Sequence, residues 1–192
     1  MRSGSRQPTG CRDNGVVAVE TAIVSMFLIV LLFGIVESAF LLKDWITVSA
    51  AARAGARMGA SQPRMPTFAD DSASQVTNAI AGLDPANLQA VWVYKATYAT
   101  GMPDSGSFAS CSVCVKYQWD AVLKKLKVSF DNWAYDSENA CAGDPGRGAL
   151  GVYVKYRHTS PLGYFFNNAT VSESTVMWIE PLSTSTICKP LP

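Results

Sequence analysis

The chain has 192 residues, of which 48% are hydrophobic and 16% charged, and its formal net charge is +1. This composition excludes a disordered chain, because disordered sequences combine few hydrophobic residues with a high net charge. It also lacks the runs of Lys and Arg that nucleic-acid-binding proteins use to contact phosphates, so we expect no nucleic acid among its partners.

The first element along the chain is a hydrophobic segment, residues 16–42, whose only charged side chains are Glu20 and Glu37. A helix of this length crosses the roughly 30 Å hydrocarbon core of a bilayer, so we predict one transmembrane helix. The two carboxylates would be about 25 Å apart, each near one edge of the hydrocarbon. The segment is too long for the hydrophobic region of a cleaved secretory signal, which is the alternative. Arginines before the segment favour a cytoplasmic N-terminus.

The helix is predicted to continue over residues 43–62, which are rich in Ala, Gly and Arg. Ala51, Gly55 and Gly59 are four residues apart and therefore lie on one face of this helix. Small residues at this spacing allow another helix or a sheet to approach the backbone closely. We expect this face to pack on the chain's own domain, and a subunit interface is the alternative use.

Pro63 and Pro66 are expected to end this helix, because proline lacks the amide donor and disfavours helical geometry in the preceding residue. Residues 68–82 then predict a short second helix that closes at Gly82. Beyond it the hydrophobic period changes to two, which indicates β-strands. The strand-like segments are residues 88–98, 114–119, 123–133, 151–158 and 170–181, with a loop over 98–109. An antiparallel sheet packed against the N-terminal helices, an α+β fold, follows.

The five cysteines are divided by the predicted membrane segment. Cys11 precedes it, while Cys111, Cys114, Cys141 and Cys188 follow it, as expected if the membrane separates a reducing from an oxidising compartment. The four distal cysteines predict two disulfides, and three pairings are open. A redox or zinc role is the alternative, but Cys111-Ser-Val-Cys114 leads into a strand, whereas a redox motif begins a helix. We expect no metal site and no cofactor.

A membrane-anchored hydrolase is the alternative from another functional class. The sequence has no Gly-x-Ser-x-Gly, no His-Glu-x-x-His and no glycine-rich phosphate loop. Its single histidine, His158, ends a predicted strand and is expected at the surface or at a sheet edge. We therefore predict that the chain is not an enzyme and assign it no catalytic residue.

The junction before the hydrophobic segment holds Gly15, four residues, and then Glu20. This Gly-x-x-x-x-Glu pattern after an Arg-bearing leader resembles the processing signal of type IV prepilins and pseudopilins. The resemblance implies that a prepilin peptidase cleaves after Gly15 on the cytoplasmic side, so that the mature chain begins at Val16. Glu20 would then pair with the α-amino group of a neighbouring subunit, which would explain a carboxylate in a membrane helix.

A longer stretch, residues 17–61, resembles the TadE-type minor pseudopilins of tight-adherence (Flp) pilus systems. Its Glu20-x-Ala22 opening and its "AARAGAR" segment match their pattern, whereas Thr21 stands where many of them carry an aromatic residue. The resemblance implies a pilin-like protein with disulfides. Its parts would be a cytoplasmic leader (1–15), a transmembrane helix (16–42), a helix extension (43–62) and an extracytoplasmic α+β domain (63–192).

The function implied by this resemblance is assembly or priming of a type IVb (Flp/Tad) adhesive pilus. The implied partners are the prepilin peptidase, other pilin and pseudopilin subunits, membrane-embedded Tad assembly proteins and the lipid bilayer of a bacterial cell membrane. An uncleaved, membrane-anchored envelope scaffold of the Tad secretion machinery is the alternative. In that case Glu20 would lie at the inner membrane interface.

Overall fold

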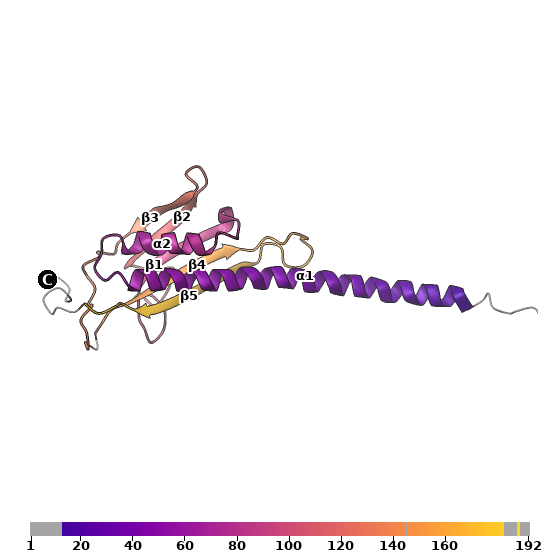
Figure 1. Ribbon diagram of the computed structural model, residues 1–192, viewed down its shortest axis with the longest axis horizontal. Helices are drawn as coiled ribbons and strands as arrows, with labels where there is room; N and C mark the ends of the chain where they lie inside the picture. Colours follow the sequence, from indigo (N-terminus) through magenta and orange to yellow (C-terminus); the bar gives the residue numbers. More distant parts are fainter. Residues whose placement is uncertain (1–12, 145, 183–187, 189–192) are drawn as a thin grey trace, which may run out of the picture.

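The computed structural model describes residues 13–144, 146–182 and 188, so Cys11 and most of the predicted leader lie outside the described residues. It confirms an α+β fold with a long N-terminal helix and an antiparallel sheet (Figure 1). The helices are α1 (Asp13–Ala60), α2 (Phe68–Ala79) and the short 3-10 helix η1 (Pro85–Asn87). The strands are β1 (Leu88–Ala96), β2 (Cys114–Asp120), β3 (Lys125–Asp131), β4 (Ala149–Arg157) and β5 (Thr170–Trp178).

Helix α1 runs without a break through the predicted membrane segment and its extension, and it ends at Ala60, shortly before Pro63. In the described part of the chain, it is the one helix long and apolar enough to cross a membrane. Its N-terminal part protrudes from the rest of the protein, which we call the head: α2, the sheet and their connections (Figure 1). No described side chain of residues 15–36 is buried, so we call these residues the uncovered segment.

The five strands form one sheet in the order β3-β2-β1-β4-β5, and all neighbours are antiparallel. Strands β4 and β5 pair along their full lengths, with Val152 opposite Thr175, and residues 158–169 connect them. We call this connection the β4–β5 loop. Each strand lies within the range predicted from the period of two or differs from it by a few residues.

The core lies between the sheet and the two long helices. Alternate residues of the central strands, such as Val91, Val93 and Val152, face α1 and α2 and are fully buried. On the other face, Tyr94 packs edge-on against Phe108, which belongs to the connection between β1 and β2. The sheet is therefore covered by helices on one face and by a loop on part of the other.

Two disulfides lie in the head, Cys111–Cys114 and Cys141–Cys188. The first closes a tight turn before β2. The second connects the segment before β4 to the C-terminal part of the chain, with a sequence separation of 47. The structure thus selects one of the three pairings that the sequence leaves open.

The two disulfides should contribute unequally to stability. Because a cross-link restricts the unfolded chain more when it closes a longer loop, replacing both Cys141 and Cys188 by serine should lower the free energy of unfolding by about 4 kcal/mol. The same double change at Cys111 and Cys114 should cost about 2 kcal/mol. Denaturant unfolding of the oxidised full chain in detergent measures both, and a reducing agent should abolish the difference. A larger loss for the Cys111–Cys114 variant would contradict this ranking.

Candidate assembly and membrane interface

The uncovered segment carries the residues predicted for processing and assembly. Gly15 and Val16 are exposed, and the peptide bond between them lies in the first turn of α1, where the backbone N–H groups have no partner within the helix. The Glu20 side chain is also exposed. Within the described residues, its carboxylate makes no hydrogen bond and no ion pair in this single chain. It is therefore accessible to a group from another subunit.

Glu37, the second carboxylate of the hydrophobic segment, is fully buried, with 0% of its surface exposed. Its Oε1 accepts hydrogen bonds from Ser160 Oγ at 3.0 Å and from the backbone N–H of Tyr164 at 2.8 Å. Its Oε2 accepts from the N–H of Phe165 at 2.6 Å and of Phe166 at 3.3 Å. The β4–β5 loop therefore closes over this carboxylate and supplies all of its donors.

A second polar contact follows two helical turns later. Asp44 Oδ2 lies 2.6 Å from His158 Nδ1, and the neighbouring Trp45 indole donates to the Glu173 carboxylate on β5. His158 is only 1% exposed and follows β4, an inner strand of the sheet, so its predicted position at the surface or at a sheet edge is wrong. It lies just beyond the end of β4, as expected, but the chain folds this strand end against α1. Glu37 and Asp44, seven residues apart, thus share the face of α1 that meets the head.

The His158–Asp44 pair has the form of two members of a Ser-His-Asp triad, but a third member is missing from the described residues. His158 Nε2, which would accept the proton of a nucleophile, is buried and has no hydrogen-bond partner there. The nearest serine in sequence, Ser160, donates its hydroxyl to Glu37. Nor does the described part of the chain bring three His, Cys, Asp or Glu side chains together as metal ligands. In the described residues, the His158–Asp44 pair connects the end of β4 to α1.

The small residues of the helix extension lie against the head. A Cβ on Gly55 would be 2.6 Å from Val76 Cγ2 of α2, and a Cβ on Gly59 would be 2.9 Å from Leu150 Cδ1 of β4. Ala51 is fully buried in the same core. The Ser72 hydroxyl of α2 donates to the Gly55 carbonyl at 2.8 Å, which fixes the two helices at this close separation.

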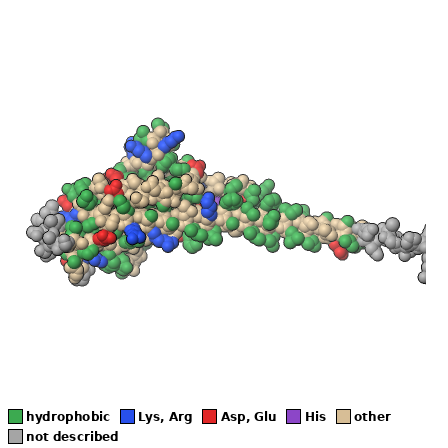
Figure 2. All heavy atoms as spheres, viewed as in Figure 1, with side chains coloured by type: hydrophobic (Ala, Val, Ile, Leu, Met, Phe, Trp, Pro, Cys, Tyr) green, Lys and Arg blue, Asp and Glu red, His purple; other side chains and the backbone are tan. Residues whose placement is uncertain are grey.

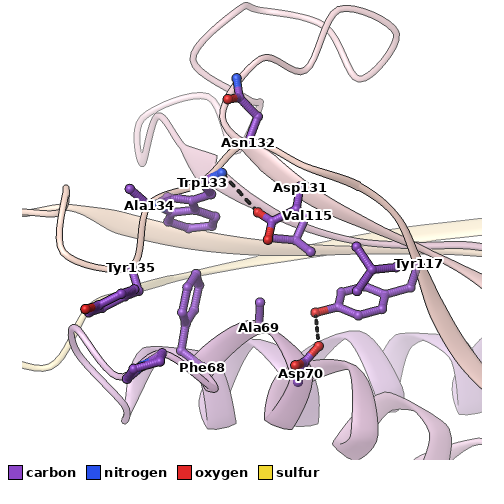
Figure 3. A pocket seen from close by; sticks show the side chains of 12 residues that line it. Phe68, Ala69, Asp70, Val115, Tyr117, Asp131, Asn132, Trp133, Ala134 and Tyr135 are labelled. Atoms are coloured by element: carbon purple, nitrogen blue, oxygen red, sulfur yellow. Dashed lines mark hydrogen bonds between the residues drawn. The ribbon is translucent and has the colours of Figure 1, made fainter.

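An open groove lies between the start of α2 and the end of β3 (Figure 3). Phe68 and Trp133 pack edge to face on one side of it, and on the other side the Tyr117 hydroxyl donates to Asp70 Oδ1 at 2.7 Å. Burial, helped by the hydrogen bond to Asp70 and its negative charge, raises the pKa of Tyr117 above its usual value. Tyr117 therefore stays protonated at neutral pH and acts as a donor that ties the sheet to α2.

A buried acid lies near the far end of β1. Glu138 accepts a hydrogen bond from the Trp133 indole at 3.1 Å and lies 3.5 Å from Lys95 Nζ. Burial raises the pKa of Glu138, and the charge of Lys95 opposes this shift. Both partners belong to the head itself, so this acid connects structural elements of the head.

Sequence comparison finds a similarity to a known family in the N-terminal part of the chain. Residues 15–57 match the family model of TadE-like proteins, which is less than a quarter of the 192-residue chain. The matched region runs from the exposed glycine before the hydrophobic segment to the small-residue face of α1. No curated protein and no solved structure matches the chain. Residues 15–57 are similar to TadE-like proteins, which confirms the resemblance seen in the sequence.

Proposed function

We propose that this chain is a minor pseudopilin that takes part in the assembly or priming of a type IVb (Flp/Tad) adhesive pilus. It acts by assembly and not by turnover of a substrate. The observation that carries the proposal is the uncovered segment, a TadE-like apolar helix with Glu20 as its only charged residue. A helix over residues 15–36 extends about 33 Å, enough to cross the hydrocarbon core without help from the head.

The proposed topology has the N-terminus in the cytoplasm of a bacterium and the head outside. The single N-terminal apolar helix fits a single-pass membrane anchor. The arginines before it support this orientation, and so do the disulfides of the head, which form in oxidising compartments. The proposed partners are the prepilin peptidase, other pilin and pseudopilin subunits and the membrane-embedded Tad assembly proteins.

The first test is the mature N-terminus, determined by mass spectrometry of the protein from its native cell with and without the prepilin peptidase. A chain that begins at Val16 only when the peptidase is present supports the proposal. An intact leader under both conditions contradicts processing and favours the uncleaved envelope scaffold.

A second test separates assembly from processing. Glu20→Gln keeps the size of the side chain but removes its charge, so it should leave cleavage after Gly15 intact and strongly reduce pilus assembly, because the intersubunit ion pair is lost. Thr21→Ala, on the same exposed turn, is the matched control, since the Thr21 hydroxyl only donates to the carbonyl of Val17. Surface pilus quantified by immunoblotting of sheared fractions gives the readout. Normal piliation with Glu20→Gln would contradict a role for this carboxylate in assembly.

A further inference from the structure

The β4–β5 loop lies where the head meets the uncovered segment of α1. Figure 1 shows this loop, in orange, beside α1 at the end of the head from which the helix protrudes. In Figure 2 hydrophobic side chains continue from the protruding helix onto this end of the head. The stretch of the loop after His158, residues 159–169, contains no charged residue.

The tip of this loop exposes large apolar side chains. Tyr164 is 74% and Phe165 52% exposed, and Leu162 and Phe166 are exposed as well. The ring of Tyr164 stacks on that of Phe33, with centroids 6.2 Å apart. Phe33 belongs to the uncovered segment, so the apolar surface of the loop tip is continuous with the surface proposed to contact lipid.

The backbone N–H groups of the loop tip all have hydrogen-bond acceptors within the protein, so they do not depend on water. The N–H groups of Leu162 and Gly163 donate to Ser160 Oγ, and those of residues 164–166 donate to the Glu37 carboxylate. Pro161 has no N–H to satisfy. Irregular backbone is tolerated at membrane depth only where its polar groups find partners inside the protein.

We infer that the tip of the β4–β5 loop, Leu162–Phe166, inserts into the outer interface of the bilayer beside α1. This is a second membrane contact, and it holds the head against the lipid surface at a fixed depth. Glu37 makes this insertion possible, because its carboxylate accepts hydrogen bonds from the N–H groups of the loop. Neither the carboxylate nor these N–H groups then needs water as a partner at this depth in the membrane. The inference rests on the proposed transmembrane position of the uncovered segment.

The test uses photo-crosslinking of the full chain in vesicles of phosphatidylcholine and phosphatidylglycerol. The photoreactive amino acid p-benzoylphenylalanine replaces Phe165 in one variant. In a second it replaces Phe27, which is 72% exposed in the uncovered segment, to report on the span itself. In a third it replaces Tyr98, which is 51% exposed and stacks on Trp178 at the far end of β5. That position is about 27 Å along the strand from the loop, so it is the matched aromatic control.

The expected result is lipid adduct at position 165 at least about tenfold above that at position 98, as for an aromatic anchor at the membrane interface. Adduct to a second copy of the chain in place of lipid would overturn the inference. The inference would also be overturned if position 27 reacted with lipid but position 165 gave no more lipid adduct than position 98. In that case the proposed membrane span would still stand. Failure of lipid adduct at both 165 and 27 would overturn the span and the inference together.

Discussion

Gly55→Leu should destabilise the head by at least about 3 kcal/mol, since overpacking a tight contact typically costs 1–3 kcal/mol and more where the neighbours cannot move. A Cβ at this position would already be 2.6 Å from Val76 Cγ2 and 3.1 Å from the backbone oxygen of Ser72. Both atoms belong to α2, which the Ser72 hydroxyl ties to the Gly55 carbonyl. A leucine would therefore have to push the whole helix away from α1.

The smaller substitution Gly55→Ala should destabilise the head in the same way but by less. It adds one methyl group at the contact but removes a glycine from a helix interior, which alone is favourable by about 1 kcal/mol. We expect a net loss of about 1–2 kcal/mol, because the contact with α2 outweighs helix propensity. Gly34→Ala is the matched control in the same helix, since a Cβ there would meet nothing within 4 Å.

Denaturant unfolding of the full chain in detergent, followed by the fluorescence of its tryptophans, measures these variants. Gly34→Ala should leave the stability of the head unchanged. If Gly55→Ala were as stable as the native chain, the small residues would not be needed for packing within the chain. Their use would then have to be sought in contacts between subunits.

The elements of this fold follow from local patterns and were therefore predictable. The apolar run of α1 and the alternation in β1, β4 and β5 depend on neighbouring residues that share a face of one helix or strand. The antiparallel sheet was also predicted, whereas the order of its strands, β3-β2-β1-β4-β5, was not. The end of α1 near Pro63 followed from the chemistry of proline.

The polar contacts between α1 and the β4–β5 loop were not predictable in the same way. Nothing in the sequence indicated that Glu37 is buried, and His158 was predicted at the surface or at a sheet edge, because no local pattern shows which distant group meets each side chain. The main partners of Glu37 are backbone N–H groups. Every residue except proline has one, so these partners cannot be recognised from residue types in the sequence. The one available signal was the seven-residue spacing of Glu37 and Asp44, which places two acids on the packing face of α1. Disulfide pairing was open for the same reason, since it depends on distances between remote segments.

Glu37→Ala should release the β4–β5 loop from α1. The change leaves three backbone N–H groups and the Ser160 hydroxyl without their acceptor, and unpaired buried donors are unfavourable. We expect amide hydrogen exchange at residues 164–166 to accelerate by at least about tenfold, as local opening becomes easier than unfolding of the sheet. Exchange measured by mass spectrometry on the full chain in lipid nanodiscs gives the readout, with the β1 amides as an internal reference.

Two further variants identify the cause of this release. Ser38→Ala changes the next residue of α1, whose hydroxyl only donates to the Gly34 carbonyl, so exchange in the loop should stay as in the native chain. Ser160→Ala removes one donor to Glu37 and the acceptor of two N–H groups, so its effect should centre on Leu162 and Gly163. Native exchange at residues 164–166 in Glu37→Ala would mean that apolar contacts such as Phe33 with Tyr164 hold the loop by themselves. Faster exchange confined to the loop would instead establish that a carboxylate in the helix is retained because it binds the backbone of this loop.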